Sequence, residues 1–276
     1  MTQGALLFAQ NNQAIDYMSM ARYCASRIQQ HLSVPVSVVT SVDQEITSDD
    51  ITVFEHIIKI EEVSHYKKTF SDGFADSKKL EWKNTARDQC YDLSPYDETL
   101  VVDTDYIINS DTLSLCWHQS RDFLIYKSAV DLAPQRDNSE FTNINEYSIP
   151  FYWATAFWFR KTETTKSFFG LVAHIRKNWN YFKKIYRIHS HSFRNDYAFS
   201  IAIHMMNGFV ADSFNGIMPG TMYYTLDNDT LLSIDDTKMH FLVQKDQGSV
   251  DMIHAKTQGL DVHVMNKFSL LRNIPQ

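Results

Sequence analysis

Two aspartates, Asp103 and Asp105, flank Thr104 directly after the apolar run 100–102. If that run is a strand of a parallel sheet, both carboxylates emerge at its carboxyl end, where α/β sheets bind ligands. Two carboxylates there repel each other and lose hydration, and a divalent cation compensates for both effects. Such a cation keeps positions open for diphosphate oxygens and stabilises charge on a phosphate leaving group. The alternative is an acidic corner whose carboxylates accept hydrogen bonds from main-chain N–H groups.

Asp227 and Asp229 form a second Asp-x-Asp triplet. Chance alone predicts about two such triplets in a chain of this composition, so the neighbouring residues must distinguish them. Threonine and asparagine surround the second triplet, which is typical of a turn. The sequence contains neither G-x-G-x-x-G nor G-x-x-x-x-G-K-[ST], and this argues against dinucleotide-dependent dehydrogenases and P-loop kinases.

The elements that must position these acids follow from the periodicity of apolar residues. An apolar run at 4–9, helical spacing over 14–32 and a β-branched run at 34–40 predict a strand–helix–strand unit with parallel strands. The remaining pattern predicts strands at 51–60, 99–102, 152–159, 239–243 and 250–254, helices at 80–93, 165–184 and 195–206, and polar loops at 62–79 and 131–150. No linker or internal repeat is visible, so we expect one continuous α/β domain.

Composition excludes several classes of protein. The chain has 276 residues, of which 44% are hydrophobic and 21% charged, with 8 Gly and 6 Pro, unlike collagen, disordered chains or coiled coils. Its 3 cysteines are widely spaced, which favours a reducing compartment over a disulfide framework or a metal site. No apolar run approaches the roughly 20 residues that span a bilayer, and the N-terminus lacks a basic signal-peptide region. We therefore expect a soluble, cytoplasmic protein without a membrane partner or an obligate protein partner.

Charge is unevenly distributed along the chain. The net charge is −7, but the segment 160–194 carries nine Lys or Arg against one acid, Glu163. That segment therefore has a charge of +8, and the rest of the chain has −15. An acidic body with one basic segment suggests a local contact with a polyanion, and the alternative is a solvated helix face.

A strand–helix–strand unit followed by a strand that ends in Asp-x-Asp, in the segment VVDTDYIINSD, resembles the GT-A fold of nucleotide-sugar glycosyltransferases. The resemblance implies a GT-A-like, Rossmann-related single domain with a mostly parallel central sheet flanked by helices. It also implies that residues 1–130 bind the nucleotide sugar, most simply a UDP-sugar, and that residues 131–276 bind the acceptor. Mn²⁺ or Mg²⁺ is the implied cofactor.

The resemblance also implies site residues. The two aspartates would bind the metal and diphosphate, with a late histidine as third ligand and a lysine on the phosphates. His254 and Lys256 in MIHAK fit these roles, and His263 with Lys267 in HVMNK is the alternative placement. The end of the first strand would contact the nucleotide, and a basic residue before the metal strand would contact the diphosphate; the complete nucleotide-sugar set is Ala9, Gln10, Asn11, Arg87, Thr104 and Lys256.

In this family an acidic residue at the start of a helix faces the acceptor, and Asp196 in FRNDY fits that position. If the enzyme inverts the anomeric centre, Asp196 is the general base that deprotonates the acceptor hydroxyl. If it retains the configuration, Asp196 orients the acceptor or stabilises charge. The alternative is an acid that only interacts favourably with the helix N-terminus.

The segments FRNDYAFSIAIH and DVHVMNKFSLLR make the chain similar to small phage-encoded glycosyltransferases that modify 5-hydroxymethylcytosine in DNA. This similarity implies a DNA acceptor and, for a phage protein, the host cytoplasm. Cations track a phosphate backbone, and a base in duplex DNA must be extruded before it reacts. The implied acceptor-binding residues are Trp153, Lys177, Lys183, Lys184, Arg187 and Arg194.

Three other functions remain open from the sequence. A glycosyltransferase could act on a saccharide or lipid-linked acceptor. A phosphohydrolase could use Asp103 as nucleophile and Asp105 as acid, although that scheme normally places its motif on the first strand. A non-catalytic protein could bind nucleic acid or nucleotide sugars, in which case replacing Asp103 by asparagine would leave its function intact.

Overall fold

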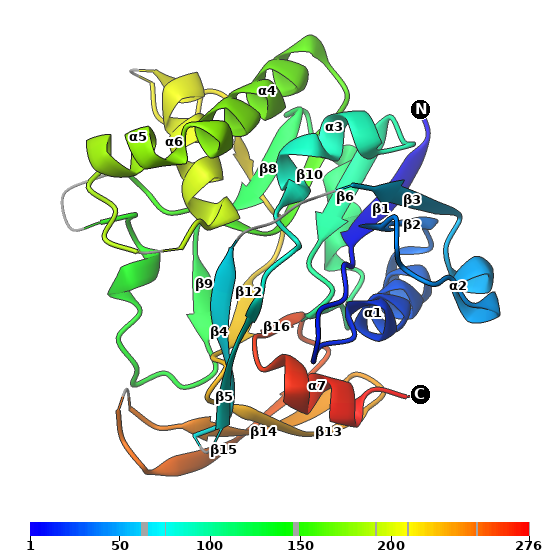
Figure 1. Ribbon diagram of the computed structural model, residues 1–276, viewed down its shortest axis with the longest axis vertical. Coiled ribbons are helices and arrows are strands. Elements are labelled where there is room, and N and C mark those ends of the chain that lie inside the picture. The colour runs from blue at the N-terminus through cyan, green and yellow to red at the C-terminus, as the bar shows by residue number, and fades with distance from the viewer. Residues whose placement is uncertain are drawn as a thin grey trace.

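The computed structural model describes residues 1–61, 66–74, 76–145, 149–190, 192–208, 210–246 and 248–275. Its centre is a seven-stranded sheet with the order β11-β8-β10-β6-β1-β2-β3 (Figure 1). The strands of this sheet are β1 (Gln3–Phe8), β2 (Val36–Ser41), β3 (His56–Ile60), β6 (Glu98–Val102), β8 (Phe123–Tyr126), β10 (Trp153–Arg160) and β11 (Gly216–Ile217).

Parallel pairing dominates this sheet. Four of the neighbouring pairs are parallel, and β10 is antiparallel to both β6 and β8. The expected fold class, an α/β domain with a mostly parallel central sheet flanked by helices, is therefore confirmed. Strands β1 and β6 end side by side, with Leu7 paired to Val102, so the residues after both strands meet at one edge.

Helices flank the sheet in two groups (Figure 1). One group contains α1 (Tyr17–Leu32), α2 (Ser48–Val53) and α7 (Lys267–Asn273), and the other contains α3 (Cys90–Leu93), α4 (Glu163–Lys177), α5 (Trp179–Ile185) and α6 (Asn195–Asn207). Short 3₁₀ helices are η1 (Ala86–Gln89), η2 (Thr112–His118) and η3 (Ser139–Phe141). Among the described helices, none is both long and apolar enough to cross a membrane.

Three smaller sheets complete the fold. A four-stranded sheet has the order β7-β16-β12-β9, a three-stranded sheet is formed by β13, β14 and β15, and β4 pairs with β5. Their bounds are β4 (Lys67–Asp72), β5 (Asp76–Glu81), β7 (Tyr106–Ile107), β9 (Ala129–Asp131), β12 (Met222–Thr225), β13 (Thr230–Asp235), β14 (Lys238–Gln244), β15 (Met252–Gln258) and β16 (Val262–Val264).

Buried hydrophobic side chains from both predicted halves of the chain belong to one core cluster. Aromatic rings fill the space between the sheet and the helices α4 and α6; for example, Phe123 contacts Phe168 with ring centroids 4.5 Å apart, and Phe157 contacts Phe199 at 4.9 Å. The division into a donor half at 1–130 and an acceptor half at 131–276 remains a prediction.

The sequence predicted several elements correctly and several wrongly. The strands near 4–9, 34–40 and 99–102 and the helix near 14–32 are present as β1, β2, β6 and α1. The strand predicted at 51–60 is wrong in its first half, because Thr47 and Asp50 form a capping box that starts α2. The loop predicted at 62–79 is mostly the hairpin β4–β5, with 62–65 and 75 outside the described residues. The predicted helix 80–93 is reduced to η1 and α3.

Candidate functional site

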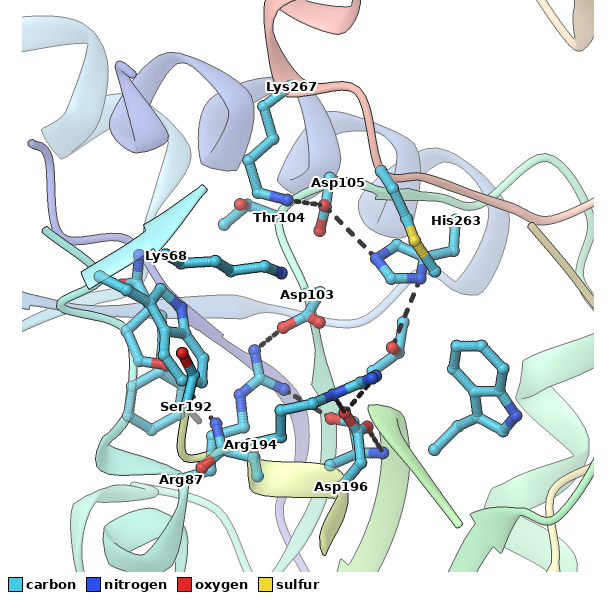
Figure 2. A pocket seen from close by; sticks show the side chains of 18 of the residues that line it. Lys68, Arg87, Asp103, Thr104, Asp105, Ser192, Arg194, Asp196, His263 and Lys267 are labelled. Carbon is cyan, nitrogen blue, oxygen red and sulfur yellow. Dashed lines mark hydrogen bonds and ion pairs between the residues drawn. The ribbon is translucent and has the colours of Figure 1, made fainter. Parts of the chain in front are cut away.

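A cavity of about 370 Å³ opens where β1 and β6 end (Figure 2). The residues that follow β6, the start of β10 and the start of α6 line it from the sheet side. The hairpin β4–β5 and the C-terminal segment line it from the other side. The lining residues with ionisable side chains are Tyr17, Lys68, Arg87, Asp103, Asp105, Arg194, Asp196, Asp227, His263 and Lys267.

An acidic centre lies within this cavity. One ligand atom each from Asp103, Asp105 and His263 lies within 4.8 Å of the others. The Asp105 carboxylate is 3.4 Å from His263 Nε2 and 2.6 Å from Lys267 Nζ. Burial on its own raises the pKa of Asp105, but the nearby Lys267 and His263 outweigh burial and hold this pKa well below its usual range. The carboxylate is therefore ionised at neutral pH.

The topology explains why these residues meet. Strand β16 pairs antiparallel with β7, and this register places His263 opposite Tyr106, next to Asp105 in the chain. The main-chain N–H of Val264 also donates to the Asp105 carbonyl at 2.8 Å. Two carboxylates and one imidazole are ligands that divalent cations accept in proteins, so the residues present fit a metal ion.

The predicted third metal ligand, His254, is not part of this centre. The MIHAK segment belongs to β15, which pairs with β14 along its whole length. There His254 is exposed, and its Nδ1 lies 2.9 Å from Nε2 of His240. Lys256 is exposed on the same strand and does not line the cavity. His263 and Lys267, the alternative placement from the sequence, lie at the centre in their stead.

The end of β1 contributes to the cavity differently from the prediction. Phe8 lines it, whereas Ala9, Gln10 and Asn11 do not. Gln10 is buried, and its N–H donates to Asn84 Oδ1 at 2.8 Å. Asn11 Oδ1 accepts the N–H of Met18 at 3.0 Å, in the first turn of α1. Gln10 thus supports the position of Asn84, a lining residue, and Asn11 supports the start of α1.

Basic side chains surround the acidic centre. Arg87 is buried, forms an ion pair with Asp103 and donates to the Ala154 carbonyl at 2.7 Å. Lys68, from β4, extends into the cavity near Asp103 (Figure 2). Desolvation inside the cavity, together with the positive charges of Lys267 and Arg194, lowers the pKa of Lys68 to about 8. Thr104 also lines the cavity, between the two aspartates.

Asp196 lies in the first turn of α6, on the wall formed by the start of β10. Its Oδ1 accepts the Ala154 N–H at 2.9 Å, and its Oδ2 accepts Arg194 Nε at 3.0 Å. Trp153 forms part of the same wall and is buried. The structure thus holds the Asp196 carboxylate in a fixed orientation at the cavity.

The basic segment 160–194 divides into two sets. In the first set, Arg160 forms an ion pair with Glu98 at 2.8 Å, and Arg176 forms one with Asp88 at 2.6 Å. Arg194, the third member of this set, lines the cavity. Over the described residues, no ion pair involves the other six cations, which are Lys161, Lys166, Lys177 at the end of α4, Lys183 and Lys184 on α5, and Arg187 after α5. Four of these six cations thus lie between residues 177 and 187.

Sequence reasoning missed several lining residues. Lys68 and Phe70 come from a hairpin that was predicted as a loop, and no spacing in that polar segment indicates a cavity. Asp227, in the triplet predicted as a turn, also lines the cavity and accepts the Ser71 N–H at 3.4 Å. The signal for Asp227 was present, because its triplet has the same Asp-x-Asp pattern as 103–105.

No family model matches the sequence, and no curated protein matches it. Among solved structures, the glycosyltransferase GlyE of Streptococcus pneumoniae TIGR4 is similar at 12% identity, over 79% of this chain and 45% of that chain, with a TM-score of 0.41. This chain thus spans less than half the length of GlyE. The galactosyltransferase LgtC, in complex with donor and acceptor sugar analogs, is similar at 11% identity over 81% and 73% of the two chains, with a TM-score of 0.43. At such TM-scores these similarities assign no activity to this chain.

Proposed function

We propose that this protein is a metal-dependent glycosyltransferase that moves a sugar from a nucleoside-diphosphate donor to a hydroxyl acceptor. One observation supports this proposal above all others. Asp103, Asp105 and His263 gather their ligand atoms within 4.8 Å in the same cavity that Asp196 lines. Residues that could hold a metal ion with a diphosphate, and an acid that could interact with an acceptor hydroxyl, therefore line the same cavity.

On the donor side, Asp103, Asp105 and His263 would hold Mn²⁺ or Mg²⁺. Such an ion neutralises diphosphate charge and stabilises the leaving group. Lys267 and Lys68 provide two ammonium groups that can bind phosphate oxygens, and both line the cavity. Arg87 keeps Asp103 in place through its ion pair and its bond to the Ala154 carbonyl.

On the acceptor side, Asp196 is the residue that orients the attacking hydroxyl. Its Oδ1 accepts one hydrogen bond, from the Ala154 N–H, and therefore retains a lone pair for an acceptor O–H, whereas Oδ2 is paired with both Nε and Nη2 of Arg194. In an inverting reaction this carboxylate takes the hydroxyl proton as general base. Trp153 lines the same side of the cavity, but with 1% of its surface exposed it offers an acceptor little contact area.

For the acceptor we propose 5-hydroxymethylcytosine in DNA. Arg187, in the group of cations at 177–187, is followed three residues later by Ser190, which lines the cavity together with Ser192. Cations next to a cavity suit a phosphodiester acceptor whose base is extruded into that cavity. Saccharide and lipid-linked acceptors are the competing outcomes of an acceptor screen.

Donor turnover tests the proposal directly. The wild-type protein is incubated with a panel of nucleotide sugars and Mn²⁺, Mg²⁺ or a chelator, and the released nucleoside diphosphate is measured. We expect turnover that the chelator abolishes and that Asp103→Asn and Asp105→Asn reduce by at least about 100-fold, since these carboxylates would hold the metal ion whose positive charge stabilises the leaving diphosphate in the transition state. Asp251→Asn, an exposed aspartate outside the cavity, is the matched control and keeps full turnover.

Two results would replace the proposal by another function. Covalent capture of a phosphate analogue on Asp103 would indicate a phosphohydrolase. Donor binding without turnover for any nucleotide sugar, unchanged in Asp103→Asn, would indicate a non-catalytic binding protein. Turnover that both aspartate substitutions leave unchanged would remove the metal centre from the reaction.

A further inference from the structure

A second hollow, of about 470 Å³, lies at the junction of α4 and α5. Tyr66 lines it, together with the six consecutive residues from Arg176 to Tyr181. It is more open to solvent than the cavity at the acidic centre. We call it the α4–α5 groove. None of the residues assigned above to donor binding, and not the acid Asp196, lines it.

The α4–α5 groove and the catalytic cavity share an aromatic wall. Phe193 lines the cavity, and its ring contacts two residues of the groove. The centroids of Phe193 and Trp179 are 5.3 Å apart, and those of Phe193 and Tyr66 are 5.5 Å apart with the rings stacked. The cavity and the groove are therefore separated by one layer of packed aromatic rings, in which Phe193 and Trp179 are buried, so a chain-like ligand that occupies both would pass outside this layer.

The groove combines exposed aromatic surface with positively charged side chains. The Tyr181 side chain is 62% exposed. Lys177 is exposed, and the sequence contains no Asp or Glu between residues 164 and 195. Asp88 is paired with the lining residue Arg176 at 2.6 Å. Lys183 and Lys184 on α5, and Arg187 after it, extend the positive charge beyond Tyr181.

This combination is suited to a single nucleic-acid strand. Aromatic rings stack on the face of any base, and flanking cations bind the phosphates, so neither element requires a particular sequence. A neutral glycan would use the aromatic rings but would not require an acid-free row of cations. The phosphates of duplex DNA would bind the cations, but its bases are stacked on one another and would present no free face to Tyr181.

We infer that the α4–α5 groove binds a single-stranded stretch of nucleic acid next to the nucleotide that enters the catalytic cavity, with a base stacked on Tyr181 and a phosphate on Lys177. This inference rests on the proposed function, because it identifies the surface along which the acceptor lies when one of its nucleotides is in the catalytic cavity. The groove itself is defined by Tyr66, Tyr181 and Lys177, outside the acidic centre.

Fluorescence anisotropy of the full chain with short labelled oligonucleotides tests the inference. We expect the single strand to bind more tightly than the same sequence as a duplex, and a labelled neutral oligosaccharide to bind weakly. Tyr181→Ala should weaken single-strand binding by roughly 10-fold, whereas Tyr181→Phe, which keeps the ring, should retain it. Lys177→Ala should lower the slope of log affinity against log salt by about 0.7.

Lys166→Ala is the matched control for charge. Lys166 is an exposed cation at the opposite end of α4 and is not part of the groove, so its removal should leave the affinity and salt slope unchanged. Equal losses in Lys166→Ala and Lys177→Ala would mean that only net charge matters, which overturns the inference. Tighter binding of the neutral oligosaccharide, or equal affinity in Tyr181→Ala, overturns it as well.

Donor turnover by the wild-type protein, measured in parallel without any oligonucleotide, separates this inference from the proposed function. If the protein releases nucleoside diphosphate but binds the single strand no better than the saccharide, the groove inference is wrong and the glycosyltransferase remains. If it binds the strand through Tyr181 and Lys177 but turns over no donor, the groove stands and the proposed function is wrong.

Discussion

The two aspartates of the acidic centre have different cationic partners. Asp103 pairs with the buried Arg87, and Asp105 pairs with Lys267. A metal ion bound by Asp105 must share its carboxylate with Lys267 or displace the ammonium group from it. Over the described residues, the ion-pair contact of His263 is with Asp105, itself a proposed ligand, so a metal ion on this imidazole would not have to displace a lysine or arginine.

The first prediction concerns His263. Replacing a ligand removes one of three donor atoms, so His263→Ala should weaken Mn²⁺ binding by about 10-fold or more. His254→Ala, an exposed histidine on β15, should leave Mn²⁺ binding at the acidic centre unchanged. Titration of each variant with Mn²⁺, followed by electron paramagnetic resonance, measures both. A larger loss in His254→Ala than in His263→Ala would contradict this assignment of the third ligand.

The second prediction concerns Lys68 and pH. The pKa of Lys68 is lowered to about 8, so its side chain is cationic below that pH and becomes neutral as the pH rises through it. Because a cation binds diphosphate and a neutral amine does not, we expect the affinity for a nucleoside diphosphate to fall as the pH rises above about 8. Isothermal titration calorimetry between neutral and alkaline pH measures this dependence.

Two variants of Lys68 serve as controls. Lys68→Arg keeps its charge over the whole range, because a guanidinium group stays protonated, and should bind without the alkaline loss. Lys68→Gln is neutral throughout and should bind weakly at every pH. An alkaline loss of the same size in Lys68→Gln would assign the pH dependence to another group.

At the scale of elements, the hairpin β4–β5 brings Lys68 and Phe70 to the cavity. Arg272 on α7 forms two hydrogen bonds to the Asp72 carboxylate, at 2.6 and 2.8 Å. The Gly73 N–H donates to the Asp227 carbonyl at 3.3 Å. The hairpin end is thus fixed to α7 and to the segment after β12, which places the middle of β4 over the acidic centre.

The third prediction follows from this attachment. Arg272→Ala removes an exposed ion pair, which changes the free energy of unfolding by about 1 kcal/mol or less. It also releases the hairpin end, so we expect a several-fold loss of donor affinity despite the distance between Arg272 and the cavity. Thermal unfolding and nucleotide titration, compared with Arg272→Lys, measure the two effects. A loss of donor affinity no larger than in a distant surface variant such as Lys166→Ala would show that the ion pair does not position β4.

Whether an element could be predicted depended on how deeply it is buried. Strands β1, β2 and β6 are apolar runs buried on both faces, and their hydrophobicity alone predicts them. In β4 and β5 most side chains are exposed and only Phe70 is buried, so their sequence resembles a loop. The hairpin exists because of its pairing and its attachment at Asp72, and neither can be predicted from local composition.

Site residues that are close together in the sequence could be predicted. Site residues that come together from distant segments of the chain could not. Asp103 and Asp105 follow a recognisable strand, so their position at the sheet edge could be predicted. The choice between His254 and His263 depends on which segment pairs with β7, and both segments have short strand-like patterns. Tertiary pairing of β16 with β7 decides it, and a single sequence does not contain that information.

At the scale of the whole molecule, a buried ion cluster joins the β9 end to the start of β13. The Arg136 guanidinium lies 2.5 Å from Asp131 and 2.8 Å from Asp229, and the three side chains are almost fully buried. Asp229 also accepts the Gln244 N–H at 2.9 Å and the Leu226 N–H at 2.8 Å. The cluster thus connects three sequence regions and fixes the triplet that presents Asp227 to the cavity.

The last prediction tests this cluster. Arg136→Met keeps the side-chain length but leaves two buried carboxylates without their cation, so we expect the free energy of unfolding to fall by about 3–5 kcal/mol. Urea denaturation measures the loss, with Arg272→Ala as a surface ion pair for comparison. Because Asp227 is two residues from Asp229, a variant that still folds should also bind the donor more weakly. A loss of stability as small as that of Arg272→Ala would mean that water or neighbouring N–H groups can replace Arg136. The acidic centre would then depend on the central sheet and α7 alone, without support from the loops that follow β9 and β12.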